Sequence, residues 1–160
     1  MRAPDELNED ASALARDIAE LADKHDLTVA VAESLTGGKL ACHLAAAPDS
    51  GDWFRGGIVA YASAVKFAVL GVPEGPVITE ACAAAMARGA ATAVGADAAV
   101  AVTGVGGPDP QEGQPAGTVC LAATYADTTN TRTCHFDGEP DEVLDQTVVQ
   151  ALRMLRDLIS

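Results

Sequence analysis

The chain has 160 residues, with 10 lysine or arginine against 23 aspartate or glutamate, so its formal net charge is −13 with histidine neutral. This balance argues against unaided binding to nucleic acid or to anionic lipid, because both need a cationic surface. The length is typical of one compact domain, and we expect residues 1–160 to form a single domain.

The first predicted elements are two helices separated by a buried strand. Apolar residues recur at spacings of four and three from Leu7 to Leu21, which predicts a helix from about Asp5 to His25. The apolar run from Leu27 to Ala32 predicts a buried strand. A polar turn, Glu33-Ser34-Leu35-Thr36-Gly37-Gly38, follows it and leads into a second helix from Lys39 to Ala47.

The rest of the chain continues this alternation. The last two strands flank the polar segment Asp127-Thr128-Thr129-Asn130, which predicts an antiparallel hairpin with a longer loop. The whole pattern predicts an α/β fold with a mixed, mostly parallel sheet flanked by helices. The predicted strands are residues 54–61, 98–102, 118–125 and 131–136. Three further helices are predicted: one that ends near Leu70, one from Thr79 to Val94, and one that begins near Pro140.

Composition also bears on metal sites, location and salt. The four cysteines form no C-x-x-C pair, so we expect no structural metal site, and Cys82 and Cys120 are expected to be small buried hydrophobes. No apolar run resembles a signal peptide or a membrane span, which predicts a cytoplasmic protein without membrane contact. The dispersed acid excess fits adaptation to high salt and an ordinary acidic enzyme equally well.

Two polar segments at predicted strand ends favour nucleophilic catalysis. Ser34 leaves a buried strand just before a helix, where backbone N–H groups could bind an oxyanion; a helix-capping role for Ser34 or Thr36 is equally open. Lys66 lies in apolar sequence, five residues after Tyr61. A desolvated lysine can lose its proton and act as base for a serine hydroxyl, although a lysine that reaches solvent and a core tyrosine are the commoner roles.

A third segment, Thr103-Gly104-Val105-Gly106-Gly107-Pro108, is a glycine-rich loop directly after a predicted strand. Its glycines allow a ligand to approach the backbone, and its N–H groups could hold an anion. It matches neither the Walker pattern nor G-x-G-x-x-G, so it is a weak signal alone. Ligands of open α/β sheets bind beyond the carboxyl ends of the strands, where all three segments are predicted to lie.

Together the three segments resemble one known family. The motifs A-E-S-L-T-G-G, G-G-I-V-A-Y with a lysine five residues after the tyrosine, V-T-G-V-G-G-P and P-A-G-T-V, in this order and spacing, are similar to the CinA C-terminal domain family of nicotinamide-nucleotide amidohydrolases. The resemblance runs from about Ala11 to the C-terminus. It implies the CinA C-terminal fold, and we expect no room for the N-terminal molybdopterin-binding-like domain of full-length CinA proteins.

The resemblance implies hydrolysis of the carboxamide of nicotinamide mononucleotide to nicotinate mononucleotide and ammonia, as in pyridine-nucleotide salvage. It implies a small-molecule nucleotide as partner and neither a metal nor a redox cofactor, and it leaves homo-oligomerisation open. The roles it implies are Ser34 as nucleophile, Lys66 as general base, Tyr61 as a third member that orients the base or shuttles a proton, N–H groups near Thr36, Gly37 and Gly38 as oxyanion donors, and Thr103, Gly104 and Gly106 as the ligand loop near ribose or phosphate.

Four departures from the family pattern concern substrate binding. The most serious removes a cation that could bind the substrate phosphate, a contact worth about 1.5–3 kcal/mol or one to two orders of magnitude in affinity. Arg55 or Arg132 could substitute for it. The chain has Tyr61-Ala62-Ser63 for the usual Tyr-Ser-Asn, Val77-Ile78-Thr79 for Val-Ser, a shorter loop without lysine at 110–115, and Gly138-Glu139-Pro140 for Gly-Asp-Arg.

The leading hypothesis is therefore a Ser-Lys amidohydrolase that acts on this nucleotide or on a related amide. The alternative is a non-catalytic nucleotide-binding or regulatory protein that kept the pocket, which the missing arginine favours. A role on DNA is disfavoured by the net charge of −13. Since the implied substrate is itself an anion, the same charge predicts that substrate affinity improves as salt screens the repulsion.

Overall fold

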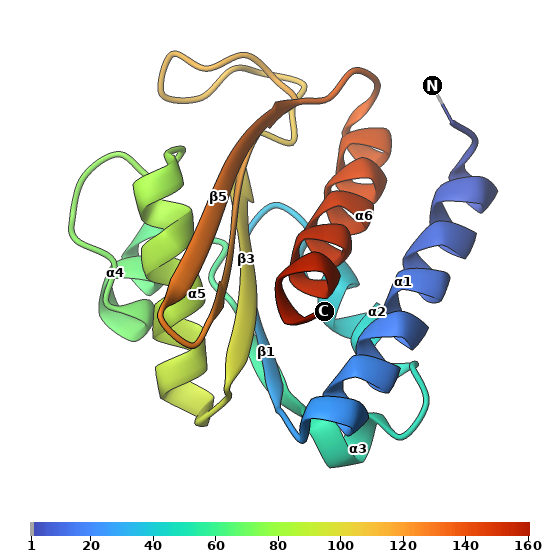
Figure 1. The fold of residues 1–160 in the computed structure, drawn as a ribbon. Coiled ribbons are helices and arrows are strands. Elements are labelled where there is room, and N and C mark those ends of the chain that lie inside the picture. Colours follow the sequence, from blue (N-terminus) through green and yellow to red (C-terminus); the bar gives the residue numbers. More distant parts are fainter. Residues whose placement is uncertain (1) are drawn as a thin grey trace.

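The computed structural model describes residues 2–160, which form three layers with the sheet in the middle (Figure 1). The five strands have the order β2-β1-β3-β4-β5. β1 is parallel to its neighbours β2 and β3, whereas β4 is antiparallel to β3 and β5. The predicted α/β fold with a mixed sheet is thus confirmed. The strands are β1 (Val29–Glu33), β2 (Phe54–Val59), β3 (Ala98–Gly104), β4 (Thr118–Tyr125) and β5 (Thr128–His135).

Helices cover both faces of the sheet. The two long terminal helices α1 and α6 pack against each other on one face, with the short α2 and α3 near the β1–β2 edge, and α4 and α5 lie on the other face (Figure 1). Both termini of the chain therefore end on the α1–α6 side. The helices are α1 (Pro4–His25), α2 (Lys39–Ala45), α3 (Ser50–Trp53), α4 (Ser63–Leu70), α5 (Glu80–Val94) and α6 (Pro140–Ile159).

The two faces of the sheet carry side chains of different size. Successive residues of a strand point to opposite faces. In β1 and β3 the valines belong to the core cluster under α1 and α6, whereas the alanines between them belong to the cluster under α5. The small alanines allow α5 to lie close to the sheet, which explains how an alanine-rich chain builds a dense core. The residues are Val29, Val31, Val100 and Val102 on one face and Ala30, Ala32, Ala99 and Ala101 on the other.

Two expectations about the chain were wrong. The segment 127–130 is not a longer loop, because β5 begins at Thr128 and pairs with Tyr125 across a tight turn in which Ala126 has a φ of 53°. β5 is an edge strand and largely exposed, so its threonines are polar yet favour extended backbone, and an apolar pattern could not reveal its first three residues. The residues between the predicted helix that ends at Ala47 and the predicted strand that begins at residue 54 are not only a connecting loop, because they contain the single helical turn α3.

Cys82 and Cys120 are each 3% exposed, which confirms that they are small buried hydrophobes. Among residues 2–160, no helix is both long and apolar enough to cross a membrane.

Candidate active site

Ser34 occupies the first position after β1, at the carboxyl end of the parallel strands. Every residue of β1 is buried, and Ser34 itself is only 7% exposed. Because β1 lies between β2 and β3, the segments that follow all three strands meet around this serine. The predicted juxtaposition of the three polar segments is therefore present.

Lys66 reaches Ser34 from the first half of α4. Its Nζ lies 3.0 Å from Ser34 Oγ, 2.8 Å from the carbonyl oxygen of Ala60 and 3.3 Å from that of Tyr61. The side chain is 2% exposed, so it does not reach solvent. Thirty-two residues separate the serine from the lysine in the sequence, and the parallel pairing of β1 with β2 brings them together.

These three contacts fit both protonation states of the lysine. An ammonium donates its three N–H hydrogens to Ser34 Oγ and to the two carbonyl oxygens. A neutral amine keeps two N–H hydrogens for the two carbonyl oxygens, and its lone pair then faces the Ser34 hydroxyl. Burial lowers the pKa of Lys66 from its ordinary value of 10.5, although electrostatic interactions with Cys82 and Glu112 oppose the shift. Geometry and electrostatics together allow Lys66 to accept a proton from Ser34.

Tyr61 contributes to this arrangement through its backbone. Its carbonyl oxygen accepts a hydrogen bond from Lys66 Nζ, whereas its side chain is 71% exposed. Within the part of the chain that the structure describes, the Tyr61 hydroxyl makes no hydrogen bond. It lies at the wall of the cavity described below, where an incoming substrate could meet it.

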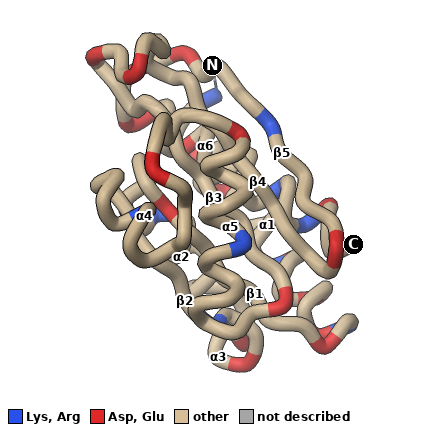
Figure 2. The backbone as a smooth tube through the Cα atoms, turned by 90° about the vertical axis from the view of Figure 1, so that its left-hand side faces the viewer, with Lys and Arg blue, Asp and Glu red and all other residues tan. Residues whose placement is uncertain are grey.

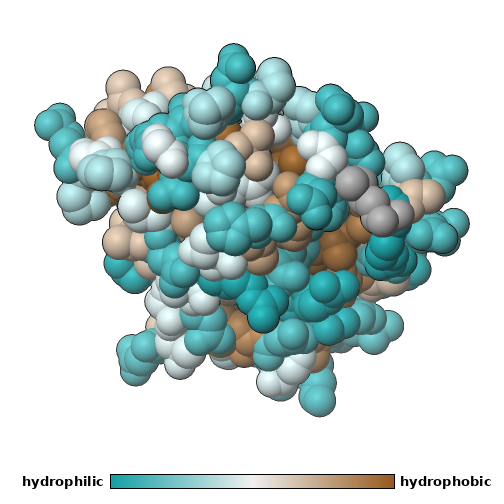
Figure 3. All heavy atoms as spheres, turned by 90° about the horizontal axis from the view of Figure 1, so that it is seen from above, coloured by the Kyte–Doolittle hydropathy of each residue, from teal (hydrophilic) through white to brown (hydrophobic). Residues whose placement is uncertain are grey.

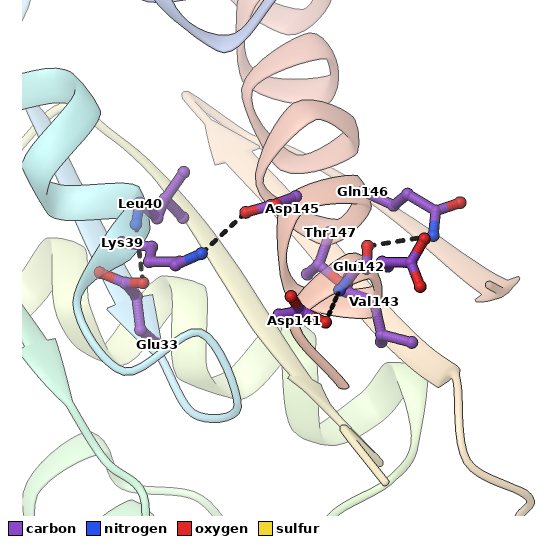
Figure 4. A network of polar contacts seen from close by, with 9 residues as sticks. All are labelled: Glu33, Lys39, Leu40, Asp141, Glu142, Val143, Asp145, Gln146 and Thr147. Atoms are coloured by element: carbon purple, nitrogen blue, oxygen red, sulfur yellow. Dashed lines mark hydrogen bonds and ion pairs between the residues drawn. The ribbon is translucent and has the colours of Figure 1, made fainter. Parts of the chain in front are cut away.

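Glu33 holds the turn that carries the serine. This carboxylate is completely buried, and its two oxygens accept four hydrogen bonds from the turn and from the start of α2. Figure 4 shows the one from Leu40. Three reach Oε1, from Thr36 Oγ1 at 2.6 Å, Leu40 N at 2.9 Å and Gly38 N at 3.2 Å, and one reaches Oε2, from Ala41 N at 2.9 Å. Sequence reasoning missed this role. The available signal was a carboxylate at the end of a wholly apolar strand, which must find partners.

The amides expected to hold an oxyanion are partly engaged elsewhere. Gly37 N donates to the carbonyl oxygen of Ser34 at 3.1 Å, and Gly38 N donates to Glu33. Thr36 is 3% exposed, and its hydroxyl donates to Glu33, so these three residues form the turn and do not line the cavity. Within residues 2–160 the N–H of Leu35, which does line the cavity, has no acceptor. It directly follows the serine, the usual place for an oxyanion donor.

The glycine-rich loop forms the opposite wall. Gly104 pairs with Val119, and a Cβ at Gly104 would lie 2.5 Å from the carbonyl oxygen of Thr118, so glycine is required there. Thr103 is 1% exposed, and its hydroxyl donates to the carbonyl oxygen of Val77 at 2.9 Å. Glu112 accepts hydrogen bonds from the N–H groups of Val77 and Ile78. Like Glu33, it is a carboxylate that holds backbone near the cavity, and the sequence did not reveal this role.

Between these walls lies a cavity of about 320 Å³. It is open at the end of the molecule where β3 ends, a face with a mostly hydrophilic rim and hydrophobic atoms between (Figure 3). Six of the predicted site residues line it, and Thr36, Gly37 and Gly38 do not. The six are Ser34, Tyr61, Lys66, Thr103, Gly104 and Gly106.

Lys66 is the only cation of the cavity wall among the described residues, and Asp109 adds a carboxylate. Arg55 cannot substitute, because it lies at the start of β2 and donates to the carbonyl oxygen of Val94. Arg132 lies on β5 and is likewise outside the cavity. Pro140, at the first turn of α6, occupies the wall. Acidic positions are spread along the whole backbone, and basic ones are fewer (Figure 2).

Two other kinds of site find no support. No group of three or more metal-ligating side chains occurs within residues 2–160.

A larger groove of about 890 Å³ lies along α4, α5 and residues 71–76, and Cys82 is the only thiol that lines it among the described residues. Burial raises the pKa of Cys82 to about 11, which leaves the thiol protonated and a poor nucleophile. The smaller cavity is therefore the better candidate for chemistry.

Comparisons with known proteins indicate a single family. The model of the family described as CinA C-terminal domain matches residues 11–159. A CinA-like protein of Frankia casuarinae is 43% identical over 138 residues, which cover 83% of this chain and 32% of that protein. The chain spans about a third of the length of the first relatives it matches.

Two further relatives match over nearly their whole length. A Pseudomonas putida protein named nicotinamide-nucleotide amidohydrolase PncC is 41% identical over 145 residues, which cover 87% of this chain and 91% of that protein. The crystal structure of a competence-damaged protein (CinA) superfamily protein from Escherichia coli has a TM-score of 0.90 and 35% sequence identity, covering 92% of this chain and 90% of that one.

Proposed function

The chain belongs to the CinA C-terminal domain family, and we propose that it hydrolyses the carboxamide of nicotinamide mononucleotide to nicotinate mononucleotide and ammonia. The name of the similar Pseudomonas putida protein supports this class of substrate. The observation that carries the proposal is the 3.0 Å contact between Lys66 Nζ and Ser34 Oγ in a buried pocket. It is the arrangement expected of a serine nucleophile with a lysine base.

The reaction begins with Ser34. Lys66, as a neutral amine, takes the hydroxyl proton while Ser34 Oγ bonds to the carboxamide carbon. The carbonyl oxygen becomes an oxyanion, for which the Leu35 N–H is a donor. As the tetrahedral intermediate collapses, Lys66 returns the proton to the departing nitrogen, and ammonia leaves an ester on Ser34. The exposed Tyr61 side chain stands where it can contact the substrate.

The second half of the reaction regenerates the enzyme. A water molecule gives a proton to Lys66 and adds to the ester carbon, and collapse breaks the bond to Ser34 Oγ. The proton returns to the serine, and the product leaves as the carboxylic acid, which loses its own proton to solvent or to ammonia and becomes nicotinate. The two halves consume one water and release one ammonia, so no redox or metal chemistry enters the balance.

Release of ammonia from nicotinamide mononucleotide tests the proposal. We expect Ser34→Ala and Lys66→Ala to abolish release. The control is Ser63→Ala, which removes a serine of the same cavity that makes no hydrogen bond to Lys66, and it should retain turnover. Tight ligand binding without any product would instead identify a non-catalytic binding protein, and unchanged release by Ser34→Ala would contradict the mechanism.

A further inference from the structure

The loop 105–117, between β3 and β4, forms one wall of the cavity. Its base is tied to the sheet, because Val105 N donates to the carbonyl oxygen of Thr118 and Gly117 N donates to that of Val105, each at 2.8 Å. Within the described residues, the backbone of 106–110 makes no hydrogen bond to the rest of the protein. The position of this middle stretch therefore depends largely on how the two ends of the loop are held.

The tip of the loop is a tight turn at Glu112. Gln111 and Gln114 pair through two backbone hydrogen bonds of 3.0 and 2.8 Å. Between them Glu112 has a φ of 51° and Gly113 a φ of 73°, and two left-handed residues in succession are typical of a type I′ turn. A left-handed glutamate is uncommon, and such a conformation persists where other contacts hold the residue. The turn therefore directs attention to what the Glu112 side chain contacts.

The Glu112 carboxylate holds the loop tip against the segment that precedes α5. Oε2 accepts from Val77 N at 2.9 Å, and Oε1 accepts from Ile78 N at 2.9 Å and from Val77 N at 3.1 Å. Both N–H groups lie just before Thr79, the N-cap of α5, so the carboxylate is also close to the positive end of this helix. Figure 1 shows the loop extending from the ends of β3 and β4 toward this helix.

The same segment is held from its other side by β3. Thr103 Oγ1 donates to the carbonyl oxygen of Val77 at 2.9 Å. Val77 thus uses its C=O to contact the end of β3 and its N–H to contact the loop tip. The end of β3, the segment at Val77 and the loop form a closed ring beside the cavity, and the Glu112 side chain is the link that completes it.

The stretch between the two held ends carries free donors. Within residues 2–160 the N–H groups of Gly106 and Gly107 have no protein acceptor, and both residues line the cavity. Such groups can bind a substrate oxygen, most strongly where that oxygen is charged. Glycine backbone is unusually free to move when nothing holds it. Donors that are already in place bind without an ordering cost, so a fastened tip favours substrate binding.

Glu112 also acts on Lys66 through its charge. Burial lowers the pKa of Lys66, and electrostatic interactions with Cys82 and Glu112 oppose this shift. The Cys82 thiol stays protonated, because burial raises its pKa to about 11, whereas a carboxylate is charged near neutral pH. Removal of the Glu112 charge should therefore move the titration of Lys66 to lower pH, which a purely structural role for Glu112 does not predict.

We propose that Glu112 is a positioning residue of the reaction: its carboxylate fastens the loop 105–117 to the segment before α5, and so holds the Gly106 and Gly107 donors in place for the part of the substrate remote from the amide. This inference rests on the proposed function for the substrate. It goes beyond that function by assigning a role to a residue that does not itself line the cavity.

Kinetics of ammonia release from nicotinamide mononucleotide test the role in binding. Glu112→Ala removes the contact, so we expect KM to rise about tenfold or more, the factor for re-ordering one backbone residue on binding. The Ser34–Lys66 pair is untouched, and kcat at a pH above the titration of Lys66 should stay within about threefold. An unchanged KM would overturn the inference.

Two further variants separate the contact from the charge. Glu112→Gln keeps one oxygen for the backbone N–H groups but removes the charge, so it should raise KM less than Glu112→Ala while shifting the rising limb of kcat/KM to lower pH by the same amount. Glu74→Ala is the matched control, because Glu74 is an exposed carboxylate of the same segment without a hydrogen bond within residues 2–160. It should change neither KM nor the limb, and equal effects at positions 74 and 112 would overturn the inference.

Backbone ¹⁵N relaxation tests the fastening in the free protein. We expect the order parameters of Gly106 and Gly107 to be close to those of rigid backbone, about 0.85, in the native protein and in Glu74→Ala, and to fall toward about 0.6 in Glu112→Ala. Equal order parameters in the three proteins would overturn the inference, and so would a rise in KM without a loss of order.

These measurements distinguish a failure of the inference from a failure of the proposed function. Absence of ammonia release by the native protein would refute the proposed function alone, because order parameters and affinity need no turnover. Calorimetry with nicotinamide mononucleotide then takes the place of KM, and we expect binding to Glu112→Ala to be about tenfold weaker or more. Equal affinities of Glu112→Ala and Glu74→Ala would overturn the inference.

Discussion

Glu33→Gln isolates the role of the buried carboxylate beneath the serine turn. Glutamine has nearly the same shape, and its amide oxygen can keep the three donors that meet Oε1. Its NH₂ group then faces the N–H of Ala41, so one hydrogen bond to a charged group is replaced by two opposed donors. The free energy of unfolding should fall by about 2–3 kcal/mol, the range for a lost charge-assisted hydrogen bond that leaves a buried donor unpaired.

Thermal unfolding and ammonia release measure the two consequences. For a chain of this length the destabilisation corresponds to a fall in Tm of about 4–12 °C. The turn also positions Ser34 against Lys66, so kcat should fall about tenfold to a hundredfold. KM should change little, because Glu33 lies outside the cavity wall.

Glu80→Gln is the matched control. Glu80 also accepts two short hydrogen bonds, from Thr131 and Thr133, but its carboxylate is exposed and its partners are hydroxyls that can rotate to accept from an amide. Its substitution should therefore destabilise the fold much less than Glu33→Gln, because solvent screens the exposed carboxylate. An unchanged Tm for Glu33→Gln, or equal losses in the two variants, would refute the assignment of Glu33 as the anchor of the turn.

Three other predictions follow from the site. Burial lowers the pKa of Lys66 below 10.5. We therefore expect kcat/KM to rise with pH through that lowered pKa, as the ammonium loses its proton, and then to level off. A kcat/KM that falls with pH over the same range would contradict the role of Lys66 as base. Tyr61→Phe should lower kcat about tenfold or more with no change in Tm, because the exposed hydroxyl has no partner within residues 2–160; a matching loss of Tm would indicate a structural role instead. Gly104→Ala should cost about 1–3 kcal/mol in urea unfolding, because its Cβ would lie 2.5 Å from Thr118 O, whereas Gly51→Ala, with open space around it, should cost nothing measurable.

The long, regular elements of this fold could be predicted from periodicity. The spacing of apolar residues places α1 within one residue of its observed start. The helix predicted from Thr79 to Val94 is α5, and Thr79 is its N-cap, with Oγ1 accepting from Cys82 N at 3.0 Å. The first three residues of the edge strand β5 were not predicted as strand, because they bury little apolar surface. β5 is polar and largely exposed, so its strand character depends on pairing with β4, which a local pattern does not encode.

The sequence by itself determined the chemical inventory of the site. A serine after a buried strand, a lysine in apolar sequence and a glycine-rich loop are local features, because strand ends and turn-forming residues can be recognised from their neighbours. The motif order also indicated the family, which the comparisons confirm. The net charge of −13 is likewise a property of composition alone.

Only the tertiary structure decided how these parts are used. Sheet order brings Lys66 to Ser34, and packing around both gives the lysine nitrogen two carbonyl acceptors besides the serine hydroxyl. Packing also assigns the amide of Gly38 to Glu33 and places Arg55 away from the cavity that Pro140 lines. Hydrogen-bond partners and local charge depend on which distant segments meet, and a linear pattern does not contain that information.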